Sequence, residues 1–518
     1  MATPSEKLAE SLKVLKDHQD VNGSAAIQAR DISRTHRERL VKAGFLEEVM
    51  KGWYVPSRPD ERPGDSTSWY ASYWRFCSSY LTERFGKNWC LSAEQSLLIH
   101  GSNMTIPKQL LVRSPAANNN TVNLLHDTSL YDLQAALPGK GESEEKDGLR
   151  IFTLAASLIT ATPGMFTSNP IDCRTALLTI RDASEILPGL LDGGRTVVAG
   201  RLAGAFRNIG KDRIADDIIK TMQQAGYDVR ETDPFASKVP GGTGRPVSPY
   251  VTRLRIMWQE MREPVVKTFP SPPGLPKDRD NFFKQVQEIY VTDAYHSLSI
   301  EGYRVTPELI KKVMSGTWDP AGSEEDRKQR DAMAAKGYHD AYQEVLKSLK
   351  KVLAGKNPGQ VADDDHGNWY RALFSASVGA GLLKPRDLAG YRNDQVYIRA
   401  SMHVPLNHDA LKDAMPEFFE LLKAEPEASV RAVLGHFIFV YIHPYMDGNG
   451  RTSRFLMNVM LASGGYPWTV VPVETRKEYF GALEKASVDG DIRPFADFLS
   501  RLVSSLMKGN PQPKIPES

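Results

Sequence analysis

The feature that most restricts the fold of this chain is a polar, glycine-containing elbow between two apolar segments. The segment before it reads VRAVLGHFIFVYI and the segment after it reads RTSRFLMNVMLA; both have the apolar density of buried helices. The elbow, HPYMDGNGRTSR, covers His443–Arg454 and brings a histidine, an aspartate, an asparagine and two arginines into this region. A core excludes such groups unless they have partners. The sequence therefore predicts a helix–loop–helix with a functional site at its turn.

The turn has the features of an anion-binding loop. Gly448 and Gly450 let backbone N–H groups approach a ligand closely, because no side chain intervenes. The helix that starts near Arg451 directs its free N–H groups and its positive dipole end toward the loop. Arg451 and Arg454 add positive charge at the same helix end, which suits a polyphosphate.

Two further groups in the elbow suit nucleotide chemistry. Asp447 offers the hard oxygen ligands that Mg²⁺ prefers when it rides on phosphates, and His443 can accept a proton near neutral pH. The alternatives are weaker. DGNG alone is typical of a hairpin turn, an EF-hand would need more acidic residues, and a metal-binding histidine lacks partners at ligand spacing. The elbow thus predicts a nucleotide site with a base beside it.

The full string resembles the signature of the Fic family, HPFx(D/E)GNGRxxR, with Tyr445 where the family usually has Phe. The run GRTSRFLMN followed by GGYP is most similar to the AMP-transferring branch, and Gly450 stands where the kinase-like Doc branch usually carries Lys. The resemblance implies an all-α domain that uses ATP and Mg²⁺ to transfer AMP to a Ser, Thr or Tyr hydroxyl of a target protein.

The resemblance also implies a role for each matched residue. His443 would deprotonate the target hydroxyl, and Asp447 would hold Mg²⁺ between the α- and β-phosphates. The remaining residues would contact ATP: the phosphates at Gly448, Asn449, Gly450 and Arg451, the γ-phosphate at Arg454, and the adenine at Asn458.

A second motif lies upstream, in YHSLSIEGYRVTPELI (295–310). Ser297 and Glu301 are four residues apart and share a helix face, and Gly302 is placed to end that helix. The three residues resemble the family's inhibitory pattern, (S/T)xxxE(G/N). The resemblance implies that Glu301 occupies the partner meant for the γ-phosphate, Arg454, so that the enzyme restrains itself. By itself the pattern is weak evidence, because a Ser and a Glu on a helix face are usually solvated or form a local cap.

The segment GYRNDQVYIRASMHVP (390–405) resembles the family's target-docking flap. As a β-hairpin it would present Val396, Tyr397 and Ile398 for strand addition to the target backbone. An ordinary surface hairpin is the alternative.

The front of the chain predicts a separate module over residues 1–60. A helix over 32–41, a break at Gly44 and two short strands over 45–49 and 53–55 form a winged-helix pattern. The module resembles the winged helix of AbiEi-type antitoxin regulators. That resemblance implies DNA contacts through Arg34, Arg37 and Lys51, whereas a solvated charged helix face is the plainer interpretation.

The remaining sequence completes a multidomain, mainly α architecture. An AbiEi-like α+β domain is expected over 61–233, with a charged surface loop at 140–148, and a Pro- and Gly-rich linker over 234–249. A C-terminal all-α Fic domain with a small β-hairpin flap is expected over 250–510, including the inhibitory helix near 290–302.

Composition limits where the protein is expected to work but identifies no partner. The formal net charge of +2 points to no nucleic-acid or membrane partner. Three cysteines without a CxxC pair favour a cytoplasmic protein, and no apolar run is long enough for a membrane span. Two alternative functions stay open: a DNA-binding regulator or antitoxin-like protein with the Fic domain as a sensor, and an enzyme that removes AMP. The assembly also stays open, with a homodimer as one expectation.

Overall fold

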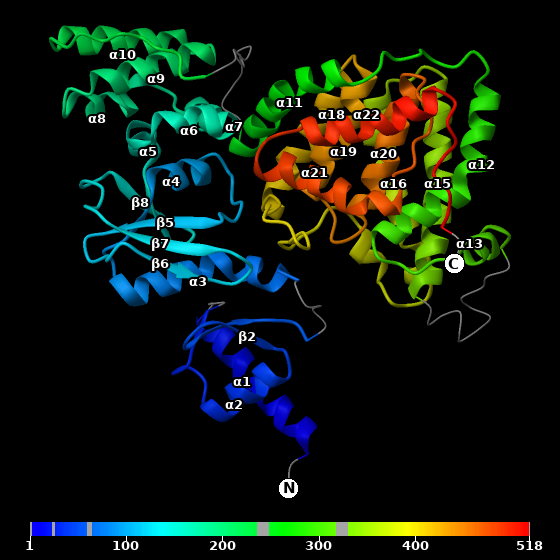
Figure 1. Ribbon diagram of the computed structural model, residues 1–518, viewed down its shortest axis with the longest axis horizontal. Coiled ribbons are helices and arrows are strands. Elements are labelled where there is room, and N and C mark those ends of the chain that lie inside the picture. Colours follow the sequence, from blue (N-terminus) through cyan, green and yellow to red (C-terminus); the bar gives the residue numbers. More distant parts are fainter. Residues whose placement is uncertain (1–2, 23–25, 60–64, 236–247, 317–329, 517–518) are drawn as a thin grey trace. The chain divides into compact units, whose positions relative to one another are not determined.

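The computed structural model divides the chain into two units (Figure 1). It describes residues 3–22, 26–59, 65–235, 248–316 and 330–516. The first unit comprises Met1–Pro249 with Tyr397–Val404, and the second comprises Tyr250–Val396 with Pro405–Ser518. Most of the predicted linker, 234–249, lies outside the described residues.

The first unit begins with a small helix and sheet module. Its elements are α1 (Pro4–Asn22), β1 (Ile27–Gln28), α2 (Arg34–Lys42), β2 (Leu46–Met50) and β3 (Trp53–Pro56). The strands form an antiparallel sheet in the order β1-β3-β2. Apolar side chains of both helices and all three strands share one small core. The second helix and the hairpin lie where the sequence predicts them, whereas β1 is an addition.

A mixed sheet follows, packed against a long aromatic helix (Figure 1). The elements are α3 (Thr67–Phe85), β4 (Cys90–Leu91), α4 (Ala93–His100), β5 (Gln109–Ser114), β6 (Asn120–Asn123), β7 (Ser129–Gln134), β8 (Ser143–Lys146) and β9 (Leu149–Phe152). The four-stranded sheet has the order β4-β5-β7-β6, with β5 and β7 parallel. The charged segment predicted as a loop at 140–148 instead contains β8, which pairs with β9 as a hairpin.

The rest of the first unit is helical and has its own apolar core. Its helices are α5 (Leu154–Thr160), α6 (Pro163–Ser168), α7 (Pro170–Thr179), η1 (Ala183–Glu185), α8 (Leu187–Leu191), α9 (Thr196–Asn208) and α10 (Asp212–Gln224). Together with the sheet, this gives the mixture of helices and strands expected for the front half.

The second unit contains helices and no strand among its described residues. These are α11 (Pro249–Thr268), α12 (Arg279–Ile300), α13 (Pro307–Met314), α15 (Arg330–Leu353), α16 (Pro358–Leu373), α17 (Ser375–Gly379), η2 (Pro385–Leu388), η3 (His408–Ala410), α18 (Leu411–Ala424), α19 (Ala428–Ile442), α20 (Asn449–Ser463), η4 (Val473–Thr475), α21 (Arg476–Val488) and α22 (Arg493–Met507). The mainly α fold class is therefore confirmed.

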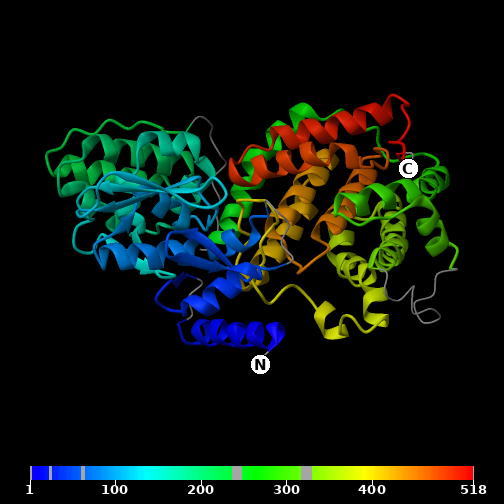
Figure 2. The ribbon, with the colours of Figure 1, turned by 60° about the horizontal axis from the view of Figure 1, so that its bottom comes forward.

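A buried helix pair forms the centre of this unit. Helices α19 and α20 pack against each other, and α15 and α16 cover α20. Figure 2 shows α22, the red helix, along one side of the bundle. Nearly every residue of α19 is buried, which explains its continuous apolar sequence. Among the described residues, no helix combines the length and apolar character needed to cross a membrane.

Candidate nucleotide-binding site

The elbow between α19 and α20 is shaped by two residues with left-handed backbone angles. His443 caps the end of α19 with φ of 55°, and Gly448 precedes the first residue of α20 with φ of 82°. A non-glycine residue in this region is uncommon and concentrates at functional sites. The two turns bound the loop 443–448, and the rest of the predicted motif, from Asn449 to Arg454, forms the start of α20.

The His443 ring is oriented by the helix that it terminates. Its Nδ1 lies 3.1 Å from the carbonyl oxygen of Val440, so Nδ1 carries the proton and donates it to that oxygen. Nε2 is then left as an acceptor. Burial lowers the pKa of His443 to about 4. The imidazole is therefore neutral at physiological pH, which is the form that a general base requires.

Asn449 and the two glycines shape the turn. The side-chain amide of Asn449 bonds both the N–H and the carbonyl of Tyr445, at 2.9 and 2.8 Å. A Cβ on Gly448 would lie 3.0 Å from the ring of Phe374, and a Cβ on Gly450 would lie 2.4 Å from Glu301 Oε1. Glycine thus lets a neighbouring side chain lie close to the backbone at both positions: the Phe374 ring at Gly448 and the Glu301 carboxylate at Gly450.

Asp447 and Arg451 form an ion pair at the start of α20 in which only the aspartate is exposed. The Asp447 side chain is 64% exposed, whereas that of Arg451 is 2% exposed, and their closest oxygen and nitrogen lie 3.2 Å apart. The Arg451 guanidinium also lies against the rings of Tyr303 and Phe374. Its Nε is buried and has no hydrogen-bond partner among the described residues. A buried cation held in this way is available to an anion at the helix N-terminus.

Arg454 is held by the last turn of α12. Its Nε donates to Ser297 Oγ at 2.9 Å, and its Nη2 donates to the Ser297 carbonyl at 3.0 Å and to Glu301 Oε1 at 2.7 Å. Burial opposes the charge of this guanidinium, but Glu301 beside it raises the pKa above the usual range. Ser297 and Glu301 thus both contact Arg454 in the structure, whereas the sequence predicted that contact for Glu301 alone.

Gly302 ends α12 where the sequence predicts. It adopts φ of 88° directly after the C-cap residue Glu301, and the N–H of Tyr303 turns back to the carbonyl of Leu298. This tight ending leaves Glu301 at the helix tip, from which its carboxylate reaches Arg454.

Comparison with known proteins agrees with this geometry. Residues 364–461 match the model of the Fic/DOC family. This part of the chain is a Fic domain. The match covers α19, the elbow and most of α20, so it contains every residue of the predicted signature. The identity of the domain therefore rests on the same residues that form the site.

Curated relatives match over the same region and beyond. Protein adenylyltransferase Fic of Nematostella vectensis is 32% identical over 240 residues, 45% of this chain and 51% of that protein. Protein adenylyltransferase fic-1 of Caenorhabditis elegans is 27% identical over 223 residues, 42% of this chain and 40% of that protein. The chain thus spans about half or less of the length of these relatives.

Solved structures give a weaker likeness. Fic-1 of C. elegans, residues 134–508, has a TM-score of 0.36 at 21% identity and covers 62% of this chain and 91% of that one. A Fic domain-containing signaling protein of Bacteroides thetaiotaomicron has a TM-score of 0.34 at 17% identity, covering 51% and 99%.

Within the Fic domain, Asn458 has internal partners. Its Oδ1 accepts from the N–H of Thr469 at 2.7 Å, and its Nδ2 donates to the Thr469 carbonyl at 3.1 Å. The side chain thereby ties α20 to the loop that follows it. Contact between Asn458 and adenine stays a prediction.

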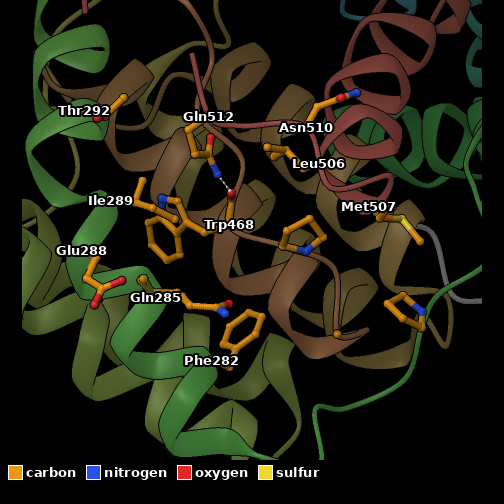
Figure 3. A pocket seen from close by; sticks show the side chains of 14 residues that line it. Phe282, Gln285, Glu288, Ile289, Thr292, Trp468, Leu506, Met507, Asn510 and Gln512 are labelled. Atoms are coloured by element: carbon orange, nitrogen blue, oxygen red, sulfur yellow. Dashed lines mark hydrogen bonds between the residues drawn. The ribbon is translucent and has the colours of Figure 1, made fainter. Parts of the chain in front are cut away.

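A cavity of about 480 Å³ opens beside the signature and includes Asp447, Arg451, Tyr303 and Phe374 in its wall. A second pocket, of about 600 Å³, lies along the first half of α12 (Figure 3). None of the predicted nucleotide ligands lines this second pocket, so its size alone does not make it the nucleotide site. The chemistry of the walls favours the first cavity for an anion.

The predicted flap residues form no strand. Val396, Tyr397 and Ile398 lie in an irregular segment, and the unit boundary falls between Val396 and Tyr397. The β-hairpin expected within the Fic domain is therefore not found in these residues. Few regular cross-strand partners are available to so short a segment, and an isolated two-stranded hairpin is only marginally stable. A docking role for the segment stays a prediction.

The predicted DNA contacts lie in the first unit and are only partly available. Arg37 donates to the carbonyls of Ala29 and Ile32 and lies over the Tyr54 ring. Arg34 pairs with Glu38 at 2.6 Å on the exposed face of α2, and Lys51 is exposed in the turn between β2 and β3. Arg37 therefore braces its own module, which leaves Arg34 and Lys51 as the accessible members of the set.

Three residues of the site were not assigned a role from the sequence. Buried Arg392 donates from Nε to the carbonyl of His443 at 2.8 Å, and its own N–H donates to the carbonyl of Pro444. Asp293, one turn before Ser297, accepts from the hydroxyl of Tyr338 at 2.7 Å. No signal in the sequence pointed to these contacts, because the partners of Arg392 and Asp293 lie 51 and 45 residues away along the chain.

Proposed function

We propose that the Fic domain transfers AMP from ATP to a Ser, Thr or Tyr hydroxyl of a protein and that Glu301 restrains this reaction. The observation that carries the proposal is the hold of Ser297 and Glu301 on Arg454, next to a glycine turn with a neutral histidine. The curated relatives named above are protein adenylyltransferases, which supports the same activity.

The donor groups of this site fit a triphosphate. Arg451 Nε and Arg454 Nη1 are buried and have no hydrogen-bond partner among the described residues. Two unsatisfied guanidinium donors at one helix N-terminus are costly unless an anion accepts from them. The first-turn N–H groups of α20 add further donors. The anionic oxygens of ATP supply the missing acceptors.

The reaction proposed for His443 follows from its tautomer. Nε2 takes the proton of the target hydroxyl while that oxygen bonds to the α-phosphorus. The bond from the α-phosphorus to the bridging oxygen breaks, and pyrophosphate leaves. The loop donors stabilise the charge that develops on the phosphoryl oxygens, and positioning supplies much of the acceleration.

The exposed carboxylate of Asp447 fits Mg²⁺, which proteins commonly bind through one or two carboxylates and substrate phosphates. The bound ion would neutralise phosphate charge in the transition state. Among the described residues no group of three or more His, Cys, Asp or Glu side chains is placed to hold a metal ion, so phosphate oxygens would complete its ligands. We place the reaction in the cytoplasm, since the three cysteines are free and buried.

Inhibition follows from competition for Arg454. A carboxylate that already accepts from Nη2 occupies a donor that the γ-phosphate needs. ATP bound beside it would have its α-phosphate misaligned for attack. Removing the carboxylate therefore frees the donor without removing any group that acts on the α-phosphate.

The test is self-labelling with ATP that carries a radioactive α-phosphate. Glu301→Gly should label itself at least about tenfold faster than the wild type, and Glu301→Gly with His443→Ala should not label. Glu308→Ala, an exposed glutamate on the neighbouring helix α13, is the matched control and should behave as the wild type. Equal labelling of wild type and Glu301→Gly would refute inhibition, and no labelling by either would refute the transfer.

A further inference from the structure

The pocket along α12 has the size of a small-ligand site (Figure 3). Its volume is about 600 Å³, within the range of about 300–1,000 Å³ that is usual for such sites. Four segments of the second unit form its walls: Pro273 before α12, residues 282–292 of α12, the loop 465–468 after α20, and residues 506–512 at and after the end of α22.

The walls favour a flat, partly polar ligand without negative charge. Phe282 and Trp468 contribute aromatic rings, and Gln285 and Asn510 contribute amides. Glu288 is the charged residue among the lining residues, which include no Lys, Arg or His. Lys284 Nζ, outside the lining, lies 4.0 Å from Glu288 Oε1. Within the lining itself a phosphate or carboxylate would meet Glu288 and no cation, whereas a neutral or cationic aromatic compound would meet complementary groups.

Gln512 favours a ligand that carries a hydrogen-bond donor. Its Nε2 donates to the carbonyl of Trp468 at 2.6 Å, as drawn in Figure 3, and this bond fixes which amide atom is the oxygen. The Oε1 atom is buried and accepts no hydrogen bond among the described residues. A buried amide oxygen without a donor is costly. An N–H or O–H group on a ligand would satisfy it.

We propose that this pocket binds a planar, uncharged or cationic heteroaromatic compound that carries an N–H or O–H donor. The ring lies between the aromatic and aliphatic walls, and its donor bonds to Gln512. Binding excludes water from Phe282 and Ile289 on α12 and from Leu506 at the end of α22, which supplies the hydrophobic part of the affinity.

Helix α12 connects the pocket to the nucleotide site. Helix α12 continues from the pocket wall to Ser297 and Glu301, which hold Arg454. A ligand that fits the present arrangement stabilises α12 where it is, by its preference for that state. If the proposed function holds, the ligand therefore strengthens inhibition rather than relieving it.

Binding is tested with three indoles of different charge. Tryptamine is cationic, indole is neutral and indole-3-acetate is anionic; their binding to the full chain is measured by ligand-observed NMR. Tryptamine and indole should bind saturably, and indole-3-acetate should bind at least about tenfold more weakly. Glu288→Lys should reduce or reverse the preference for tryptamine over indole-3-acetate. Nonspecific hydrophobic binding would not respond to this substitution.

Ile289→Trp fills the cavity and should abolish binding of tryptamine and indole. The matched control is Val266→Trp, at an exposed apolar position of α11, which should bind as the wild type. Circular dichroism of each variant establishes that it is folded. Absence of saturable binding to the wild type, or unchanged binding to Ile289→Trp, would overturn the proposal.

Self-labelling separates this proposal from the proposed function. Tryptamine should slow labelling by the wild type and leave Glu301→Gly unaffected, because that variant no longer depends on α12. Binding with no labelling by any variant would refute the transfer and leave the pocket standing. Labelling without binding would refute the pocket and leave the transfer standing.

Discussion

At the scale of single residues, His443 combines a left-handed backbone φ angle with a lowered side-chain pKa. The left-handed turn aims its ring from the end of α19, and the bond to Val440 fixes the proton on Nδ1. Burial then keeps the ring neutral. Each property has a separate physical cause, and together they leave Nε2 unprotonated and able to accept a proton.

The pH dependence of labelling tests this acidity. With a pKa of about 4, the neutral form dominates at pH 6 and above and is lost as the pH falls toward 4. The labelling rate of Glu301→Gly should therefore change little between pH 8 and pH 6. A histidine with the ordinary pKa of about 6.5 would instead lose about fourfold over that interval. Single-turnover labelling at saturating ATP measures the profile, with circular dichroism to exclude unfolding at the acid end.

Gly450 tests how closely Glu301 approaches the loop. The added methyl of Gly450→Ala would lie 2.4 Å from Glu301 Oε1, so one of the two must move. We expect the free energy of unfolding to fall by about 1–3 kcal/mol, the usual cost of overpacking. Urea unfolding of the second unit, followed by tryptophan fluorescence, measures the change.

The background variant Glu301→Gly supplies the control for this substitution. In that background the clashing carboxylate is absent, so Gly450→Ala should cost much less. The two single variants and the double variant form a cycle whose coupling energy should exceed about 0.5 kcal/mol. A coupling near zero would mean that the glycine serves only ligand approach.

At the scale of elements, α12, which we propose to be inhibitory, has a second polar anchor. Asp293, Ser297 and Glu301 recur every four residues on one face, and each has a partner on a neighbouring helix. Desolvation raises the pKa of Asp293 to about 6, although the Tyr338 hydroxyl opposes that shift. The helix is therefore docked by a group whose charge is unfavourable at neutral pH.

This unfavourable charge predicts the effect of Asp293→Asn. The pKa is about 6 in the folded chain against an ordinary value of 3.8, so the free energy of unfolding falls as the pH rises through that window and is level above it. Asparagine keeps an acceptor for Tyr338 and carries no charge. The gain in stability should be about 1–2 kcal/mol larger at pH 8 than at pH 5.

Urea unfolding at the two pH values measures the gain. Asp280→Asn, at an exposed position in the first turn of the same helix, is the matched control and should show no such pH dependence. A gain that is equal at both pH values would show that Asp293 is not protonated in the folded state.

The same elements show what the sequence could and could not predict. The end of α12 was predictable because Gly302 accepts the left-handed angle that the turn requires. Strand β8 was missed because all four of its residues are exposed, so it has no burial alternation. The Fic signature was predictable because its chemistry is contiguous. Arg392 and Tyr338 were missed because only the folded chain brings them to His443 and Asp293.

At the scale of the whole molecule, the two units have separate interiors. The first unit has apolar cores of its own, and the second is built around the buried α19 and α20. A unit with its own core can fold without the rest of the chain. The assignment of Tyr397–Val404 to the first unit is the exception, since this segment lies inside the sequence of the Fic domain.

Separate interiors predict that residues 250–518 fold alone. The isolated fragment should unfold cooperatively, and its Glu301→Gly variant should bind ATP within about twofold of the full-length variant, because the groups assigned to ATP all lie in the second unit. Circular dichroism melting and calorimetric titration with ATP test both expectations. A parallel fragment in which a glycine linker replaces 397–404 removes the one segment that belongs to the first unit. Cooperative unfolding of that second fragment alone would mean that 397–404 needs the front half, whereas non-cooperative unfolding of both would refute the independence of the second unit.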